Sequence, residues 1–287
     1  MYNCIQFSEK YLEPLEKLNK LSANFNPCNK NFLERYNKLS YIQRYFEKKK
    51  VKLLKYNDEY VGFIWLRHIK VRLFNIEALY VIPCEKELQH YKELLTLAEI
   101  NAEYTYECEK NETNFDVLSN LGFTKKEGTI EMYCDLQEKN DIQFESDITI
   151  RKFVQNKDEK LRCSIQNEIF MKEGRIPISV EDIYYDMAQP YYYDDGVFFI
   201  NFKDEIIGYG QIIIDKGKAF IVNFGIKKNY RGKGYSKCLM SFLLNFLKDN
   251  NFKIVYIKVD CSNKIAYNLY TSFGFKMEKE IYVWERS

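Results

Sequence analysis

The chain has 287 residues, of which 46% are hydrophobic and 29% are charged, so it can form two domains of ordinary size and is not intrinsically disordered. Its 43 Lys and Arg residues nearly balance its 41 Asp and Glu residues. The resulting net charge of +2 gives no general attraction for nucleic acid or for an anionic membrane, so any polyanionic ligand must be bound by a local cluster of charge.

Cysteine and histidine usage argues against a metal site. The 8 cysteines are scattered without a CxxC pair, and histidine occurs only at His68 and His90. The N-terminal residues show no basic cluster followed by an apolar core, and no later stretch reaches about 18 uncharged apolar residues. We therefore expect a cytoplasmic protein with reduced cysteines, no metal and no membrane partner.

The first half reads as a series of short helices and strands. Its hydrophobic pattern predicts a short strand from residue 5, followed by helices over 9–23 and 30–48. Three strands follow, over 51–56, 60–68 and 70–82, and Asn57-Asp58 is a turn signal that predicts a hairpin between the first two. The remaining elements are a helix over 85–101, a strand over 103–108, a short helix ending at 121–123 and a strand over 128–136.

The same order of elements recurs in the second half. The polar segment Gln137–Asp147 has no sustained periodicity and is typical of a link between domains. After it we expect a strand over 148–152, helices over 157–172 and 180–189, strands over 197–202, 205–214 and 218–226, a helix over 234–250, a strand over 253–259, a helix over 263–273 and a strand over 277–285. Each half closes its last helix with a Gly-Phe pair, at 122–123 and 274–275, which indicates a duplication with domains at 1–138 and 146–287.

The segment from Phe224 to Lys237 joins a predicted strand to an amphipathic helix. Gly232 and Gly234 let the backbone turn tightly and approach a ligand at the helix start, where free amides point outward. The segment also carries 5 cations, at Lys227, Lys228, Arg231, Lys233 and Lys237. Together these features indicate a site for a phosphate-bearing ligand, with a solvated basic loop as the alternative. The spacing is that of neither a Walker loop nor a Rossmann fingerprint.

This loop resembles motif A of the GNAT superfamily of acyl-CoA N-acyltransferases. The family's pyrophosphate loop has Arg or Gln, then Gly three residues later, then Gly or Ala two residues after that; the matching residues here are Arg231, Gly234 and Ser236. Serine at the last position departs from the family pattern but is still small. A second family motif is matched by Asn263, Ala266, Tyr270, Gly274 and Phe275. The resemblance is detailed over residues 197–285 and looser over 148–196.

The resemblance implies a fold and a co-substrate. It implies an α/β (α+β) protein of two tandem GNAT-like domains, each with a mixed, mostly antiparallel central sheet of six to seven strands flanked by helices. It also implies that acetyl-CoA binds where the fourth and fifth strands of the second domain separate. The cofactor-binding residues would be Phe224, Gly225, Ile226, Arg231, Gly232, Lys233, Gly234, Tyr235, Ser236, Asn263, Ala266 and Tyr267, although Tyr267 could equally be a core residue.

The family mechanism implies direct attack of an amine on the thioester. A backbone amide near Phe224 would stabilise the oxyanion, and Tyr270 would hydrogen bond to the leaving thiolate or protonate it. Many relatives have a Glu on the fourth strand, but the strand here has no carboxylate, and Asn223 could hold a water without acting as the base. Weaker candidates for the base are Glu173, Asp186 and the Asp194-Asp195 pair, since charged loop residues are usually only solvated.

The first half lacks the features that bind the cofactor. Aligning Val81 with Ile226 places the segment 84–89 where the second half has its two glycines. Both glycines are missing there, Glu85 and Glu87 would repel a pyrophosphate, and Leu118 stands at the position of Tyr270. We therefore expect a degenerate GNAT-like first domain.

These observations predict an N-acetyltransferase that transfers the acetyl group of acetyl-CoA to a primary amine of a small molecule or peptide. We expect a monomer or homodimer with no nucleic acid partner. Two alternatives stay open. One is a non-catalytic acyl-CoA sensor, and the other is an aminoacyl transferase of the peptidoglycan-bridge type, whose members also have two such domains but generally lack the glycine loop.

Overall fold

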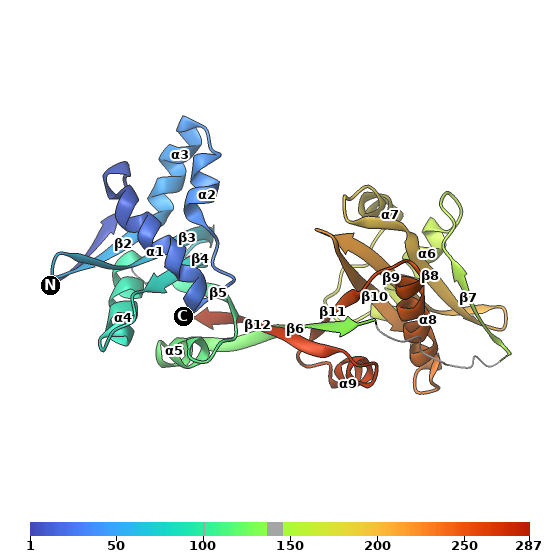
Figure 1. The fold of residues 1–287 in the computed structure, drawn as a ribbon. Helices are drawn as coiled ribbons and strands as arrows, with labels where there is room; N and C mark the ends of the chain where they lie inside the picture. Colours follow the sequence, from blue (N-terminus) through green and yellow to red (C-terminus); the bar gives the residue numbers. More distant parts are fainter. Residues whose placement is uncertain (100, 137–145) are drawn as a thin grey trace. The chain divides into compact units, whose positions relative to one another are not determined.

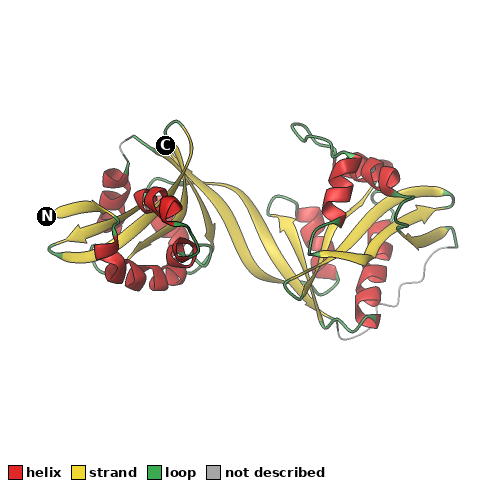
Figure 2. Cartoon of the chain, turned by 90° about the horizontal axis from the view of Figure 1, so that it is seen from above, coloured by secondary structure: helices red, strands yellow, loops and turns green. Residues whose placement is uncertain are grey.

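A computed structural model describes residues 1–99, 101–136 and 146–287. The chain divides into two compact units, one formed by Met1–Thr129 with Lys279–Ser287 and the other by Ile130–Glu278. The predicted link Gln137–Asp147 lies outside the described residues except for its last two positions. In each unit, helices flank the strands of a sheet (Figure 2).

The first unit follows the predicted order of elements (Figure 1). They are β1 (Tyr2–Gln6), a 3-10 turn (Glu9–Tyr11), α1 (Leu12–Phe25), α2 (Phe32–Asn37), α3 (Tyr41–Glu47), a 3-10 turn (Lys48–Lys50), β2 (Val51–Tyr56), β3 (Glu59–Lys70), β4 (Leu73–Val81), α4 (Glu87–Ala98), β5 (Glu103–Glu109), α5 (Asn114–Asn120) and β6 (Thr124–Asp135). The β2–β3 hairpin is confirmed, with positive φ angles at both Asn57 and Asp58.

The prediction of one helix over residues 30–48 is wrong. Two helices, α2 and α3, occupy this range. Ser40 starts the second of them with a capping box, in which its side chain accepts from the backbone N–H of Gln43 and the side chain of Gln43 accepts from the backbone N–H of Ser40. The shared apolar periodicity of the two helices concealed this break.

The second unit repeats the order. It contains β7 (Ile148–Lys152), α6 (Glu159–Phe170), α7 (Val180–Met187), β8 (Tyr192–Phe202), β9 (Glu205–Asp215), β10 (Lys218–Ile226), a 3-10 turn (Lys228–Tyr230), α8 (Tyr235–Asp249), β11 (Ile254–Asp260), α9 (Lys264–Ser272) and β12 (Lys276–Arg286). Strands β7 to β10 pair antiparallel in sequence, and β10 pairs parallel with β11. The mixed, mostly antiparallel sheets confirm the predicted fold class.

Two apolar layers sandwich the sheet of the second unit. Alternate residues of β8 face opposite sides, as strand geometry requires. Val197 and Phe199 belong to one core cluster with Ile165 of α6, whereas Phe198 and Ile200 belong to another that includes residues of α8. Helices α6 and α8 therefore cover opposite faces of the sheet and leave the ends of its strands open.

The last strand of each half is shared between the units. The strand orders are β1-β2-β3-β4-β5-β12-β6 in the first unit and β12-β6-β11-β10-β9-β8-β7 in the second. In the first unit, Ile281–Arg286 of β12 pair with residues of β5; in the second, Ile130–Asp135 belong to β6 beside β11. The compact units thus differ from the ranges 1–138 and 146–287 at these two strands.

Candidate functional site

The strands β10 and β11 separate near their C-terminal ends. Their parallel pairing ends at Ile221 and Ile257, although both strands continue. A cavity of about 210 Å³ opens beyond this point. Its walls come from both strands, from the end of α6 and from α9: Phe170, Ile221, Val222, Asn223, Phe224, Ile257, Lys258, Val259, Asp260, Asn263 and Tyr270. Asn223, Phe224, Asn263 and Tyr270, all predicted from the sequence, therefore lie around one cavity.

A β-bulge shapes the β10 side of the cavity. The register against β9 shifts between Val222 and Gly225, and Asn223 adopts a left-handed conformation with φ of 49°. Gly225 itself has no positive φ. Its role is close approach, because a Cβ there would lie 2.4 Å from Cγ2 of Ile169 on α6. The residue that carries the unusual backbone conformation of the bulge is therefore Asn223.

Tyr270 places a phenol at the cavity wall. The side chain is 6% exposed, its ring lies 6.2 Å from that of Phe224, and its hydroxyl makes no hydrogen bond to any residue that the structure describes. Burial raises the pKa of Tyr270 to about 12. The hydroxyl is therefore a protonated donor at neutral pH with no protein acceptor.

The start of α9 fixes the other residues of the second motif. The side chain of Asn263 accepts a hydrogen bond of 3.1 Å from the amide of Ala266 and caps the helix, which leaves its Nδ2 free to donate toward the cavity. Ala266 and Tyr267 pack partly buried against the apolar core and do not line the cavity.

The loop before α8 presents open backbone donors. Gly232 and Gly234 have φ angles of 80° and 87°, and a Cβ at either position would meet nothing within 4 Å. Gly234 is the N-cap of α8, and within the described chain the amides of residues 232–236 make no hydrogen bond. A helix start with free, converging amides is suited to an anion.

The cations of this loop divide by function. Arg231 donates to the carbonyls of Ile226 (2.8 Å) and Ile169 (3.0 Å), which ties the loop to β10 and α6. Lys227 is paired with Glu168 at 3.2 Å and Glu205 at 3.5 Å. It therefore contributes less to an anion site than the sequence suggested.

The remaining residues of the loop differ in whether their side chains are exposed to solvent. Lys228, Lys233 and Lys237 are solvent-exposed and supply the positive field at the loop. The ring of Tyr235 is buried beside that of Phe202, so its amide is the group it offers a ligand. Ser236 is partly exposed in the first turn of α8.

A buried polar network lies behind Asn223 and was not found from the sequence. Arg162 of α6, only 1% exposed, donates to Oδ2 of Asp186 and at 3.0 Å to Oε1 of Gln211. Gln211 donates from Nε2 to the same carboxylate at 3.0 Å, and Asn223 donates from Nδ2 to Oε1 of Gln211, also at 3.0 Å. Tyr191 donates to the second oxygen of Asp186 at 3.0 Å.

The charged members fix the orientation of both amides. A guanidinium only donates and a carboxylate only accepts, so Gln211 must turn its oxygen to Arg162 and its nitrogen to Asp186. The group of Asn223 that meets the oxygen of Gln211 must then be its nitrogen. The Oδ1 of Asn223, a cavity-lining residue, is left as an acceptor without a partner among the described residues.

The network predicts an unequal effect of two carboxylate changes. Asp186→Asn leaves the buried guanidinium of Arg162 without its anion, and we expect the free energy of unfolding to fall by about 3 kcal/mol. Asp195→Asn is the control, because Asp195 pairs with Lys152 where both side chains are largely exposed, and it should change stability little. Urea unfolding of both variants measures the difference, and equal losses would contradict the role of the network.

The other acidic candidates lie apart from the cavity lining. Glu173 and Asp194 are solvent-exposed, and Asp195 forms an ion pair with Lys152.

One feature of the sequence could have predicted the polar network. Arg162 stands in helical spacing with Ile165 and Ile169 on the buried face of α6. A charged residue at such a position requires a buried partner.

Comparison with known proteins identifies this architecture. Residues 166–275 match the family model described as Acetyltransferase (GNAT) family. This match runs from α6 to just past α9 and covers less than half of the chain, so it shows that this segment is similar to the GNAT family. The chain also resembles in fold the solved structure of a tandem GNAT protein from the clavulanic acid biosynthesis pathway, with a TM-score of 0.55 and 10% identity over 99% of this chain and 98% of that one. That likeness concerns the fold of the whole chain, both units included.

Two curated relatives match only part of this chain. It is 26% identical over 132 residues to the mycothiol acetyltransferase of Thermomonospora curvata, covering 45% of this chain and 44% of the relative. It is 31% identical over 88 residues to the ribosomal protein bS18-alanine N-acetyltransferase of Haemophilus ducreyi, covering 29% of this chain and 59% of the relative. The matched segments thus span about half the length of these relatives.

Among the described residues, no group of three or more His, Cys, Asp or Glu side chains is arranged to hold a metal ion. None of the helices in the same residues has the length and apolar character needed to span a bilayer.

Proposed function

We propose that the second unit transfers the acetyl group of acetyl-CoA to a primary amine. The observation that carries this proposal is the coexistence, in one unit, of an open amide cradle at residues 232–236 and a cavity between separated strands that ends on the hydroxyl of Tyr270. When bound, acetyl-CoA supplies an acyl group activated as a thioester.

The cradle fits a diphosphate. The two glycines keep Cβ atoms away from the loop, and the amides of residues 232–236 can each donate to phosphate oxygens. Arg231 holds the shape of the loop through two carbonyls, while exposed lysines attract the anion. Beyond the last β10–β11 pair, the backbone of Phe224 and Ile226 offers strand-type groups to an extended amide chain. Asn263 can donate to it from the opposite wall.

Two residues of the cavity, Asn223 and Tyr270, form hydrogen bonds to the reacting groups. Oδ1 of Asn223 accepts a hydrogen bond from the attacking amine and so orients its lone pair, although an amide cannot take the proton away. Tyr270 donates a hydrogen bond to the departing sulfur. A thiol has a free pKa of about 8.5, and burial holds the pKa of Tyr270 at about 12, so full proton transfer is uphill and hydrogen bonding is the main contribution.

The acceptor class rests on the relatives. One curated relative is named a mycothiol acetyltransferase, and the other is named an N-acetyltransferase of an alanine of ribosomal protein bS18. A primary amine is the acceptor we propose for this chain. Acetyl-CoA turnover measured with a panel of small amines and peptide N-termini tests the proposal. Coenzyme A binding without turnover on any of them would favour the acyl-CoA sensor instead.

We further propose that the first half, predicted as 1–138, no longer binds the cofactor. The loop between β4 and α4 carries Glu85 at its tip and has no glycine, and α4 is preceded by Lys86 in place of a glycine N-cap. Calorimetry of the full chain should therefore show one coenzyme A per chain. A second equivalent bound with similar affinity would contradict the assignment of the cofactor site to the second unit alone.

A further inference from the structure

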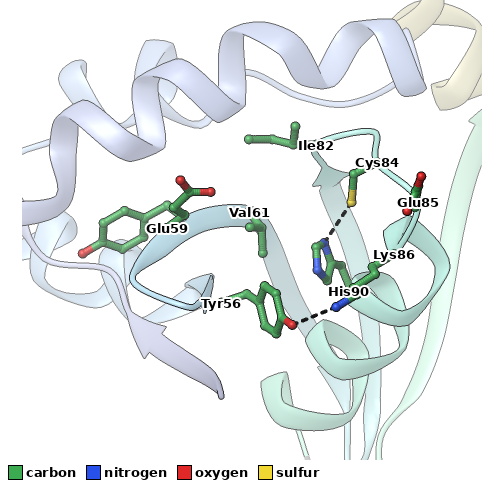
Figure 3. A pocket seen from close by; sticks show the side chains of 9 residues that line it. Tyr56, Glu59, Val61, Ile82, Cys84, Glu85, Lys86 and His90 are labelled. Atoms are coloured by element: carbon green, nitrogen blue, oxygen red, sulfur yellow. Dashed lines mark hydrogen bonds between the residues drawn. The ribbon is translucent and has the colours of Figure 1, made fainter.

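The first unit has a cavity of its own at the loop between β4 and α4. Its volume is about 390 Å³. The walls come from the β2–β3 hairpin, the end of β4 and the start of α4 (Figure 3): Tyr56, Glu59, Tyr60, Val61, Ile82, Cys84, Glu85, Lys86 and His90. By alignment, this loop stands where the second unit has its amide cradle. In that alignment Glu87 and Gln89 stand at the positions of the two glycines, and Cys84 and His90 lie on either side of them.

Cys84 and His90 face each other in this cavity. Sγ of Cys84 lies 3.7 Å from Nδ1 of His90, which projects from the first turns of α4 (Figure 3). The imidazole packs against the rings of Tyr2 and Tyr56, with centroids 5.6 and 5.2 Å away, and these two rings also contact each other at 4.6 Å. Among the cysteines of the described chain, Cys84 is solvent-exposed, and the others are partly or fully buried. The thiol is therefore open to small molecules while its neighbour is fixed in place.

The second ring nitrogen of His90 is buried and unpaired. His90 is 3% exposed, and its Nε2 is buried without any hydrogen-bond partner among the described residues, whereas polar atoms at such depth are normally paired.

The imidazole is neutral at pH 7 and therefore carries a lone pair. The titratable groups around it are Tyr2, Tyr56, Cys84 and Lys86. Burial, with the nearby Lys86, lowers the pKa of His90, so the ring is neutral at pH 7. With the ring proton on Nε2, the lone pair of Nδ1 faces the thiol.

We propose that Cys84 is a modification site at which the protein exchanges with low-molecular-weight disulfides, with His90 as the proton acceptor. The thiol proton passes to Nδ1, and the thiolate attacks one sulfur of the disulfide. A new S–S bond joins Cys84 to that half, the original S–S bond breaks, and the departing thiolate takes a proton. Cys84 is oxidised to the mixed disulfide and the other half of the reagent is reduced to a free thiol.

The test compares two cysteines in one molecule. The full reduced chain is treated with 2-hydroxyethyl disulfide, whose neutrality removes steering by Glu59, Glu85 and Lys86, and the initial rates at Cys84 and Cys261 are read by peptide mass spectrometry. At pH 7 we expect Cys84 to react about tenfold faster than the partly exposed Cys261. Equal rates would overturn the proposal.

Substitution of His90 tests whether Cys84 reacts fast because His90 accepts its proton or only because the thiol is solvent-exposed. His90→Phe keeps a ring packed against Tyr2 and Tyr56 but removes both nitrogens, and His90→Gln is a second variant should the first fold poorly. Either should slow Cys84 about tenfold at pH 7. The deficit should close near pH 10, because a free thiol with pKa of about 8.5 then ionises unaided. An unchanged rate at pH 7, or a deficit that persists at pH 10, would refute the role of His90.

Discussion

Tyr270→Phe is expected to lower kcat about 100-fold while leaving the Kd for coenzyme A within about threefold of the wild type. The substitution removes one hydroxyl at the cavity wall and keeps the ring contacts with Phe224 and Phe275. The lost interaction is one that strengthens as negative charge develops on the departing sulfur, so it should appear in turnover and not in ground-state binding. Release of free thiol from acetyl-CoA gives kcat, and calorimetry gives the Kd.

The pH dependence of the same variant tests the state of the phenol. Burial raises the pKa of Tyr270 to about 12, so the hydroxyl remains a donor at every pH below that value and is lost only as the pH rises through it. The ratio of wild-type to variant kcat should therefore be constant between about pH 6 and pH 10. A basic limb that falls within this range and disappears in the variant would show that the phenol ionises earlier.

Tyr256→Phe is the matched control. Tyr256 lies on β11, and its ring stacks on Phe220 at 5.3 Å, outside the cavity lining. Loss of its hydroxyl should leave both kcat and coenzyme A affinity unchanged. Full activity in Tyr270→Phe would remove Tyr270 from the mechanism, and an equal loss in Tyr256→Phe would attribute the effect to the fold.

The parts of the site that the sequence predicts are those built from consecutive residues. Gly232 and Gly234 act through their own backbone conformations, and the cap of Asn263 on Ala266 spans three residues, so a short pattern contains them. The network behind Asn223 is different, because Arg162, Asp186 and Gln211 come from three elements that only the folded sheet brings together. Local spacing carries no information about such a meeting.

The strands also show that local features can be predicted from the sequence, whereas contacts between distant segments cannot. Most predicted strands are present within a few residues, since alternation and turn signals are local. The neighbour of a strand is not a local property, and β12 pairs with β5 of the first unit even though its sequence resembles the end of a self-contained second half. Hydrophobic alternation predicts that a segment is a half-buried strand, but it does not determine which strands pair with it.

Gly234→Val is expected to weaken coenzyme A binding about 100-fold, which is the loss of roughly two charge-assisted hydrogen bonds. Gly234 has a φ of 87°, and a β-branched residue avoids that conformation even though a Cβ would meet nothing within 4 Å. Relief of the strain turns the amides at the start of α8 away from one another, and the new methyl groups lie where a diphosphate would approach. Calorimetry with coenzyme A measures the change.

Gly217→Val separates this effect from backbone strain. Gly217 lies in the turn between β9 and β10, has a φ of 79° and, like Gly234, would place a Cβ in open space. Both variants should therefore lose a similar free energy of unfolding, of about 1–2 kcal/mol, but only Gly234→Val should lose affinity. If the two variants bind coenzyme A equally well, the amides at residues 232–236 do not hold the diphosphate. The acetyl transfer proposed for this cavity would then lack its anchor.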